Sequence, residues 1–114
     1  MVNNPELVGL KDDRGKLRYD LITPECLEGI AEVLTLGANK YRPNTWQNVE
    51  DGNDKHYASL MRHLIAWRMG EIYDRESGLH HMKHILTNAM FCLYHDSHPY
   101  IPSDNQIKFK FTEK

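Results

Sequence analysis

Residues 79–95 read LHHMKHILTNAMFCLYH, and this stretch indicates the fold class more clearly than any other part of the chain. Its apolar side chains recur at intervals of three and four residues, the period of an α-helix with one face turned to a core. His98 and Pro99 end the pattern. The stretch therefore predicts an amphipathic helix whose core-facing residues are Met82, Ile85, Leu86, Ala89 and Leu93.

Two earlier stretches carry the same period and predict two more helices. The first begins after Thr23, a favourable N-cap, with Pro24 at the first helical position, and it ends before Pro43. Its predicted apolar face consists of Leu27, Ile30, Ala31, Leu34, Ala38 and Tyr41. The second begins near residues 53–54 and weakens at Gly70. We therefore predict an all-α fold, a small bundle of three main helices joined by ordered loops.

The length and composition indicate one small globular domain. The chain has 114 residues, of which 40% are hydrophobic and 26% charged. We expect a single domain over residues 1–114, with its core at about 9–95 and a C-terminal tail at 96–114. A domain of this size buries only about two-thirds of its unfolded surface, so a thin core and a homo-oligomer, a dimer or larger, are expected. In the tail, residues 106–111 alternate polar and apolar, which predicts a short strand or a clamp on a neighbouring subunit.

Charge and cysteine usage narrow the classes of partner. The formal net charge of -2 argues against a nucleic-acid polymer or an anionic membrane as partner. No window approaches the ~20 apolar residues of a membrane span, and the N-terminus lacks the apolar segment of a signal peptide. Two cysteines do not make a disulfide framework. We expect a cytoplasmic protein. The chain also lacks the P-loop, the nucleophile elbow and the His-Glu-x-x-His motif.

An acidic stretch, GEIYDRESG, lies at residues 70–78 between the second and third predicted helices. Its three carboxylates repel one another unless something compensates, and Mg²⁺ or Mn²⁺ does so with oxygen ligands. A solvated acidic turn, or capping of the next helix by Asp74, Glu76 or Ser77, is the alternative. The candidate metal ligands are Glu71, Asp74 and Glu76, together with Glu28 on the first helix, whose acidic face is otherwise expected to be solvated.

Polar side chains form a strip along the third predicted helix, made of His81, His84, Asn88 and His95. Two histidines three residues apart can bind one metal ion, or one can contact phosphate while the other carries a proton. Half-buried histidines bonded to loop carbonyls are the alternative. We expect His63 on the second helix to face the same space, although a lone helical histidine is more often structural.

Basic and aromatic residues could recognise a nucleotide if the fold gathers them. Lys16, Arg18 and Lys40 are scattered, and guanidinium or ammonium groups suit phosphate oxygens. Trp46 offers a flat surface for stacking on a nucleobase, although it could equally cover the small core.

A series of short motifs in this order is similar to the phage-encoded dATP/dGTP diphosphohydrolase family: DRGKLRYDL at 13–21, GANKY at 37–41, NTW at 44–46, RH at 62–63 and GEIYDRESGL at 70–79, followed by His81 and His84. The resemblance covers about residues 9–94. The family is placed near the MazG-like all-α pyrophosphohydrolases. The resemblance therefore implies a MazG-like fold and hydrolysis of purine deoxynucleoside triphosphates to the monophosphate and pyrophosphate, with Mg²⁺ or Mn²⁺ as cofactor.

The resemblance also suggests roles for the candidate residues. Glu71 and Asp74, with Glu76 or Glu28, would hold the metal, and Glu71, His81 or His84 would orient or deprotonate the attacking water. The substrate-binding candidates are Lys16, Arg18, Lys40, Trp46, His63 and Asn88. Two alternatives stay open. A non-catalytic phage protein could sequester a nucleotide signal in the host cytoplasm, or the chain could be a purely structural helical module.

Overall fold

A computed structural model describes residues 14–99 of the chain. They form three α-helices, α1 (Pro24–Lys40), α2 (Gly52–Arg68) and α3 (His81–Ser97), and two short 3-10 helices, η2 (Tyr19–Leu21) and η3 (Thr45–Asn48). Extended backbone pairs within this range only at an isolated antiparallel bridge between Tyr73 and His80. The predicted all-α class with three main helices is confirmed. The strand or clamp expected at residues 106–111 lies outside the described residues.

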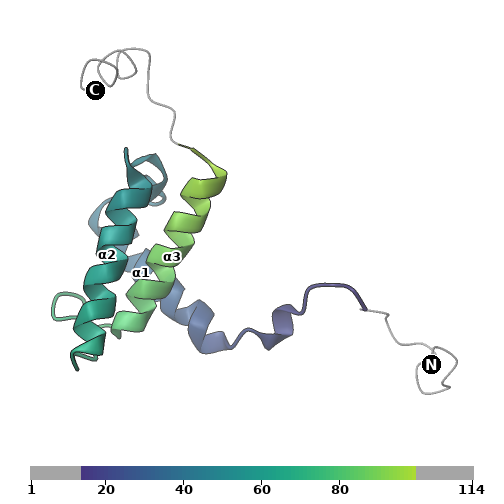
Figure 1. The fold of residues 1–114 in the computed structure, drawn as a ribbon, viewed down its shortest axis with the longest axis horizontal. Helices are drawn as coiled ribbons and strands as arrows, with labels where there is room; N and C mark the ends of the chain where they lie inside the picture. The colour runs from purple at the N-terminus through teal and green to yellow at the C-terminus, as the bar shows by residue number, and fades with distance from the viewer. Residues whose placement is uncertain (1–13, 100–114) are drawn as a thin grey trace, which may run out of the picture.

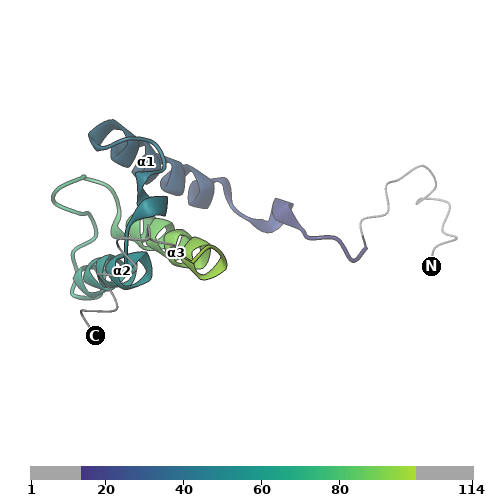
Figure 2. The ribbon, with the colours of Figure 1, turned by 90° about the horizontal axis from the view of Figure 1, so that it is seen from above.

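The three helices form two layers. α2 and α3 run antiparallel beside each other, and α1 crosses one face of this pair (Figures 1 and 2). α3 packs against both other helices. The connection between α2 and α3 forms a wide loop beside the end of α2, whereas residues 14–23 make an arm that extends away from the helices (Figure 1). α3 is therefore the element that holds the fold together.

Hydrogen bonds of the preceding loop explain why α3 begins at His81, two residues later than its apolar pattern predicts. The carbonyl of Leu79 accepts a bond from the Asp74 amide at 2.8 Å, and the His81 amide donates to the carbonyl of Ile72 at 2.9 Å. His80 is the N-cap, because its Nδ1 accepts from the Met82 amide at 2.9 Å. The loop thus takes residues 79–80 away from the helix.

Polar side chains, not apolar ones, fill the most buried positions. Among the described residues no hydrophobic side chain is fully buried, whereas Thr87, His81, Asn88 and His95 are 0%, 2%, 6% and 6% exposed. The Thr87 hydroxyl and the Asn88 amide donate to the carbonyls of Lys83 and His84, one turn earlier in α3. These bonds keep the buried polar groups satisfied.

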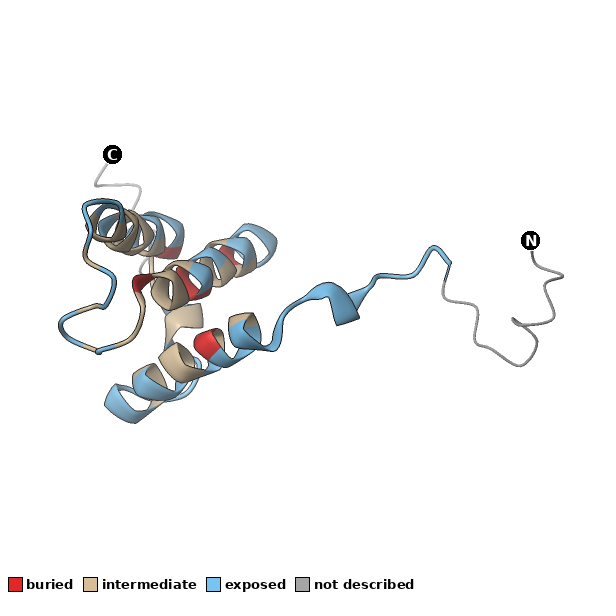
Figure 3. Ribbon diagram, turned by 90° about the horizontal axis from the view of Figure 1, so that it is seen from below, coloured by how far each residue is buried: buried red, intermediate tan, exposed pale blue. Residues whose placement is uncertain are grey.

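The predicted apolar face of α3 is therefore partly wrong. Met82 and Ile85 are half-buried, but Leu86, Ala89 and Leu93 are exposed. The reason is that α1 and α2 approach α3 on the side of the polar strip. Figure 3 shows the few buried positions on the inner sides of the helices and the exposed arm. No helix within residues 14–99 has the length and apolar character that a membrane crossing requires.

Two glycines allow α3 to approach its neighbours closely. A Cβ built on Gly52, the first residue of α2, would lie 2.5 Å from His95 Nε2, and one on Gly29 of α1 would lie 2.7 Å from Lys83 Cγ. Lys83 also pairs with Glu32 at 2.6 Å, which ties α3 to α1. The helix pattern alone gives no sign of these contact points, because neither glycine contributes to an apolar stripe.

Candidate functional site

Three segments bring histidine and acidic side chains together at one end of the α2–α3 pair. This histidine–carboxylate cluster consists of His63 from α2, Glu71 and Asp74 from the loop, and His81 and His84 from the first turn of α3. Four of its five members were candidates from the acidic stretch and the histidine strip. His63 was expected to face the same space, and it does.

A carboxylate fixes the state of the buried His81 ring. His81 Nε2 lies 2.7 Å from Glu71 Oε2. Because an ionised carboxylate only accepts, Nε2 carries the proton in this pair, and the neutral ring then has its lone pair on Nδ1. The bond from His81 lowers the pKa of Glu71, and Arg75, 2.8 Å from Glu71 Oε1, lowers it further. Glu71 is therefore ionised and presents an acceptor to His81.

The turn between Asp74 and Gly78 orients the second carboxylate. The Ser77 amide donates to Asp74 Oδ2 at 2.8 Å, and Gly78, at φ 75°, closes the turn by donating to the carbonyl of Asp74. Burial alone raises the pKa of Asp74, but the bonds from Ser77 and the neighbouring histidines lower it overall. Asp74 is an anion whose Oδ1 faces His63 Nδ1 at 4.0 Å.

His63 and His84 stack with their ring centroids 4.3 Å apart and their planes within 2°. Burial lowers the pKa of both rings, and the coulombic effect of His84 lowers that of His63 further. Both are therefore neutral near pH 7, the form that binds metals or accepts protons. His63 Nδ1 also lies 2.8 Å from His81 Nδ1.

Ser77 was expected only as a possible capping residue, yet its hydroxyl lies 2.7 Å from His84 Nε2. A serine–histidine–aspartate triad would need the carboxylate at the other ring nitrogen. Here Asp74 Oδ2 lies 3.9 Å from the same Nε2. The arrangement therefore does not form a nucleophilic triad, and Ser77 serves to position His84 and the loop.

Three side chains of the cluster could hold one metal ion. His63, Asp74 and His81 each offer one ligand atom, and these atoms all lie within 4.8 Å of one another. His63 and Asp74 are half-buried, and His81 is buried. Such a set leaves room for water or substrate oxygens in the remaining coordination positions.

The other acidic candidates lie apart from this set. Glu76 Oε1 accepts from Lys40 Nζ at 3.2 Å, an exposed contact that joins the end of α1 to the loop. Glu28 is exposed on α1, and within residues 14–99 no hydrogen bond or ion pair joins it to the cluster. Their proposed metal ligation remains a prediction, with Asp74 and Glu71 nearer the candidate metal position.

The basic candidates divide into two groups. Lys40 lies beside the loop through its contact with Glu76, whereas Lys16 and Arg18 are on the arm that extends from the helices (Figure 1). Arg18 forms a bidentate ion pair with Asp20, in which Nε donates to Oδ1 at 2.8 Å and Nη2 donates to Oδ2 at 2.7 Å. Of the three basic candidates, Lys40 is therefore the one that the fold of a single chain brings toward the cluster.

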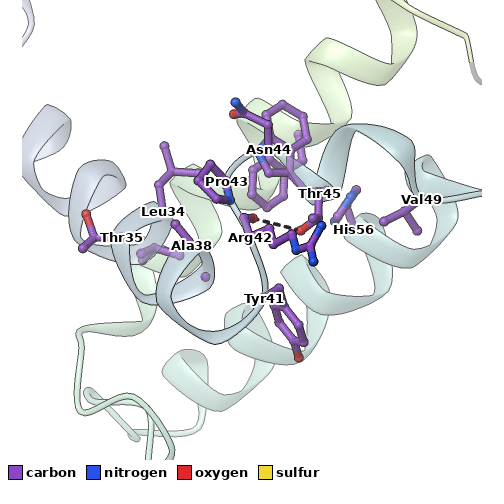
Figure 4. A pocket seen from close by; sticks show the side chains of 14 residues that line it. Leu34, Thr35, Ala38, Tyr41, Arg42, Pro43, Asn44, Thr45, Val49 and His56 are labelled. Atoms are coloured by element: carbon purple, nitrogen blue, oxygen red, sulfur yellow. Dashed lines mark hydrogen bonds between the residues drawn. The ribbon is translucent and has the colours of Figure 1, made fainter.

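A cavity of about 770 Å³ lies between the second half of α1, the first turns of α2 near His56, and α3 near Phe91. Its lining is mostly apolar and comes from residues 33–35, 37 and 38 of α1, the segment 41–46, and Val49, His56 and Phe91. Figure 4 shows Tyr41, Arg42 and Asn44 on the segment that follows α1, with His56 and Val49 beside them. The volume is within the range of small-molecule sites.

Trp46 lines this cavity and is also built into the fold. Its ring stacks on Phe91 with centroids 4.2 Å apart, and Tyr94 meets it edge-on at 4.9 Å. The Trp46 carbonyl lies 3.1 Å from His95 Nε2. Trp46 thus covers part of the small core and also borders the cavity, so its stacking on a nucleobase remains a prediction. Asn88, another substrate candidate, is buried with its amide engaged by His84 and Ser59.

The cavity and the cluster are aligned along the seam between α2 and α3. His63 follows His56 by seven residues on α2, and Phe91 follows His84 by seven residues on α3. Seven residues are two helical turns, so each pair lies on one face of its helix, about 10 Å apart. A ligand that extends along the seam can therefore meet both places.

The family description "dATP/dGTP diphosphohydrolase, N-terminal" matches residues 8–102, a range that contains the cluster and the cavity. The chain belongs to this family. A protein of Salmonella phage PMBT28 named dATP/dGTP diphosphohydrolase is 32% identical over 88 residues, which cover 77% of this chain and 30% of that relative. The chain thus spans less than a third of the length of the relative. No solved structure gives a significant match. The family resemblance seen in the motifs is confirmed.

Proposed function

We propose that this family member hydrolyses dATP and dGTP to the monophosphate and pyrophosphate with the help of a divalent metal ion. The observation that carries the proposal is the family match over residues 8–102, because it contains both the cluster and the cavity. The named activity of the phage relative supports the substrate class. Because the chain spans only 30% of the length of that relative, hydrolysis by this chain is a proposal that its own cluster and cavity must support.

The cluster contains the groups that hydrolysis requires. A Mg²⁺ or Mn²⁺ ion bound there would supply a water of lowered pKa and would offset phosphate charge. Asp74 is the carboxylate that would hold it, and Glu71 lies behind it, bonded to His81. His84, which is neutral because burial lowers its pKa, can accept a proton from the attacking water. Ser77 holds the His84 ring in place through the contact at 2.7 Å.

The remaining candidates suit the rest of the substrate. Lys40, exposed beside Glu76, can exchange this carboxylate for a phosphate oxygen. The purine is proposed to enter the cavity, where Trp46 and the polar groups of Asn44 and Thr45 are available. The spacing of two helical turns between His56 and His63 is the span that the sugar and the phosphate chain would cover.

We also propose that the active form is a homo-oligomer. Within residues 14–99 no hydrophobic side chain is fully buried, and fourteen large ones are exposed, Leu17, Leu21, Leu86 and Leu93 among them. Burying such surface is the usual driving force for association. An arm that extends from one copy is suited to bring Lys16 and Arg18 to the site of another.

Product analysis tests the proposal. The full chain is incubated with dATP, dGTP, dCTP and dTTP in the presence of Mn²⁺ or Mg²⁺, and the products are separated by anion-exchange chromatography. We expect a purine monophosphate and pyrophosphate, with no reaction in EDTA. Release of the deoxynucleoside and triphosphate, or no turnover of any nucleotide, would contradict it. Tight binding with the nucleotide recovered intact would favour the sequestering protein instead.

A further inference from the structure

We propose that His63, Asp74 and His81 form a binding site for a first-row transition-metal ion, such as Mn²⁺, Co²⁺ or Zn²⁺, in preference to Mg²⁺. The inference assigns two histidine ligands and one carboxylate to the metal, and it makes Glu71 an outer residue that positions His81. Its catalytic meaning rests on the proposed function, but the binding itself is measured without nucleotide.

The tautomer of His81 directs one lone pair toward the metal position, and His63 supplies the second donor after a proton shift. Without a metal, His63 Nδ1 donates the shared proton to His81 Nδ1, so metal binding moves this proton to Nε2 of His63 or releases it. The Glu71 carboxylate accepts the Nε2–H of His81 at 2.7 Å, so the lone pair of Nδ1 is directed away from Glu71. His63 Nδ1 lies 2.8 Å from it. Two nitrogens bound to one ion at 2.0–2.1 Å lie roughly 2.9–3.4 Å apart. A shift of a few tenths of an ångström therefore places an ion between the two rings.

The carboxylate donor is oriented in the same way. Ser77 donates its amide to Asp74 Oδ2, which leaves Oδ1 facing His63 at 4.0 Å. Ligands on opposite sides of one ion are separated by about 4 Å. All three ligand atoms lie within 4.8 Å of one another, so small side-chain rotations complete the set.

Glu71 forms the outer partner that metal-binding histidines commonly have. A carboxylate that accepts from the second ring nitrogen fixes the tautomer and raises the basicity of the ligand. Glu71 does this for His81, and Arg75 in turn holds Glu71 at 2.8 Å. This chain of contacts explains why a buried histidine has an ionised carboxylate beside it.

The donor set determines the class of ion. Imidazole nitrogen suits Zn²⁺, Ni²⁺ and the other late first-row ions, and affinity rises from Mn²⁺ through Co²⁺ along this series, whereas Mg²⁺ prefers oxygen ligands and keeps much of its water. Within residues 14–99, Asp74 supplies the one carboxylate of the candidate set at the position between His63 and His81. Since two of three donors are nitrogens, a transition-metal ion gains more from this site than Mg²⁺ does.

The same position does not suit a bare anion. The N-terminus of a helix binds phosphate through free amides of its first turn. In α3 these amides are occupied, because His81 donates to Ile72, Met82 donates to the His80 ring and Lys83 donates to the His80 carbonyl. The anionic Asp74 and Glu71 also oppose a phosphate that has no cation beside it.

Titration of the untagged 114-residue chain with single metals tests the inference. Calorimetry compares Co²⁺, Zn²⁺, Mn²⁺ and Mg²⁺ without nucleotide, and the absorption of Co²⁺ reports nitrogen ligation. We expect one ion per chain, with Co²⁺ and Zn²⁺ bound about 100-fold or more tightly than Mg²⁺. Side-chain ¹⁵N spectra should show the Nδ1 signals of His63 and His81 shifting on addition of Zn²⁺.

Variants separate ligands from neighbours. Asp74→Asn and His63→Gln should each weaken Co²⁺ binding about 100-fold and change its spectrum. Glu71→Gln should weaken it about 10–100-fold while keeping the spectrum, with the His81 ring in a mixture of tautomers. His98→Gln is the matched control, because His98 is exposed and contacts Tyr94 outside the cluster. Circular dichroism establishes that each variant is folded, and His63→Gln tests the site if a change at buried His81 unfolds the chain.

Each outcome is decisive for one of the two proposals. Mg²⁺ binding as tight as that of Co²⁺, or unchanged Co²⁺ binding in His63→Gln, would overturn the histidine ligands even if nucleotide is hydrolysed. Conversely, a Co²⁺ site that depends on His63 and Asp74, in a protein that hydrolyses no nucleotide, would support the metal site and contradict the proposed function.

Discussion

His56 and His81 both lie at the inner side of the helix pair, but their neighbours give the two rings different chemistry. His81 has an ionised acceptor, Glu71, at 2.7 Å. His56 stacks with His95 at a centroid distance of 5.2 Å, and its buried Nε2 has no hydrogen-bond partner within residues 14–99. At the residue scale, burial without a charged partner therefore favours the neutral ring of His56.

The His56 ring predicts acid sensitivity. Burial lowers its pKa below the ordinary 6.5, so the unfolded chain binds the proton more readily than the folded protein. The free energy of unfolding should therefore lose nothing to His56 above pH 6.5, and it should fall as the pH drops below this value toward the lowered pKa of His56. Urea unfolding between pH 5 and 8, about one unit or more on each side of 6.5, measures this pH dependence. His56→Gln should flatten part of the slope, and His98→Gln should not. A slope unchanged in His56→Gln would contradict this origin.

At the scale of single elements, the period of the apolar residues predicted the three helices but not the side that α3 buries. On α3 the polar strip is inside, whereas Leu86 and Leu93 are exposed. Periodicity reports which residues share a face, and packing decides which face is covered. The loop boundary at His80 also depends on hydrogen bonds with Ile72 and Asp74, which a pattern within the helix does not contain.

The candidate site was predictable where chemistry is concentrated in the sequence. The acidic stretch and the histidine strip gave Glu71, Asp74, His81 and His84, and the structure brings these together. The partners that orient them were less visible: Ser77 acts through its amide and hydroxyl, and His63 is one histidine on a separate helix. The cavity beside His56 requires three helices to be placed relative to one another, which no local pattern specifies.

Close contact between helices predicts opposite effects for two glycine substitutions. Gly52→Ala should destabilise the protein by about 1–3 kcal/mol, because the new Cβ would lie 2.5 Å from the buried His95 ring. Gly37→Ala is the matched control in α1, where a Cβ meets nothing within 4 Å, and it should stabilise the helix by up to about 1 kcal/mol. Chemical denaturation measures both. Equal effects of the two changes would contradict the packing of α2 against α3.

At the scale of the whole molecule, the described residues 14–99 do not form a closed apolar core. The described helices bury polar groups at their centre and leave Tyr19, Ile65 and Met69 exposed, 71%, 52% and 82% respectively. A small domain has little surface to bury internally, so association with identical copies is the direct way to gain stability. The extended arm carries four exposed apolar residues, which add to the apolar surface that association would bury (Figure 1).

Association predicts a mass at least twice the 13.4 kDa of the chain. Multi-angle light scattering on a size-exclusion column measures this mass at micromolar concentration. Because folding is then coupled to assembly, the midpoint of thermal unfolding should rise with protein concentration. A monomer with a concentration-independent midpoint would contradict the homo-oligomer.

The most direct test of the account is the rate of pyrophosphate release from dATP and dGTP by two matched variants. Asp74→Asn removes a charge from the cluster. Asp96→Asn makes the same change at an exposed position of α3, where Asp96 accepts a bond from Asn53. With Mn²⁺ present, we predict release by the wild-type protein and by Asp96→Asn, and a rate lower by about 100-fold or more in Asp74→Asn. Full activity in a folded Asp74→Asn protein, or none in the wild type, would contradict the central claim.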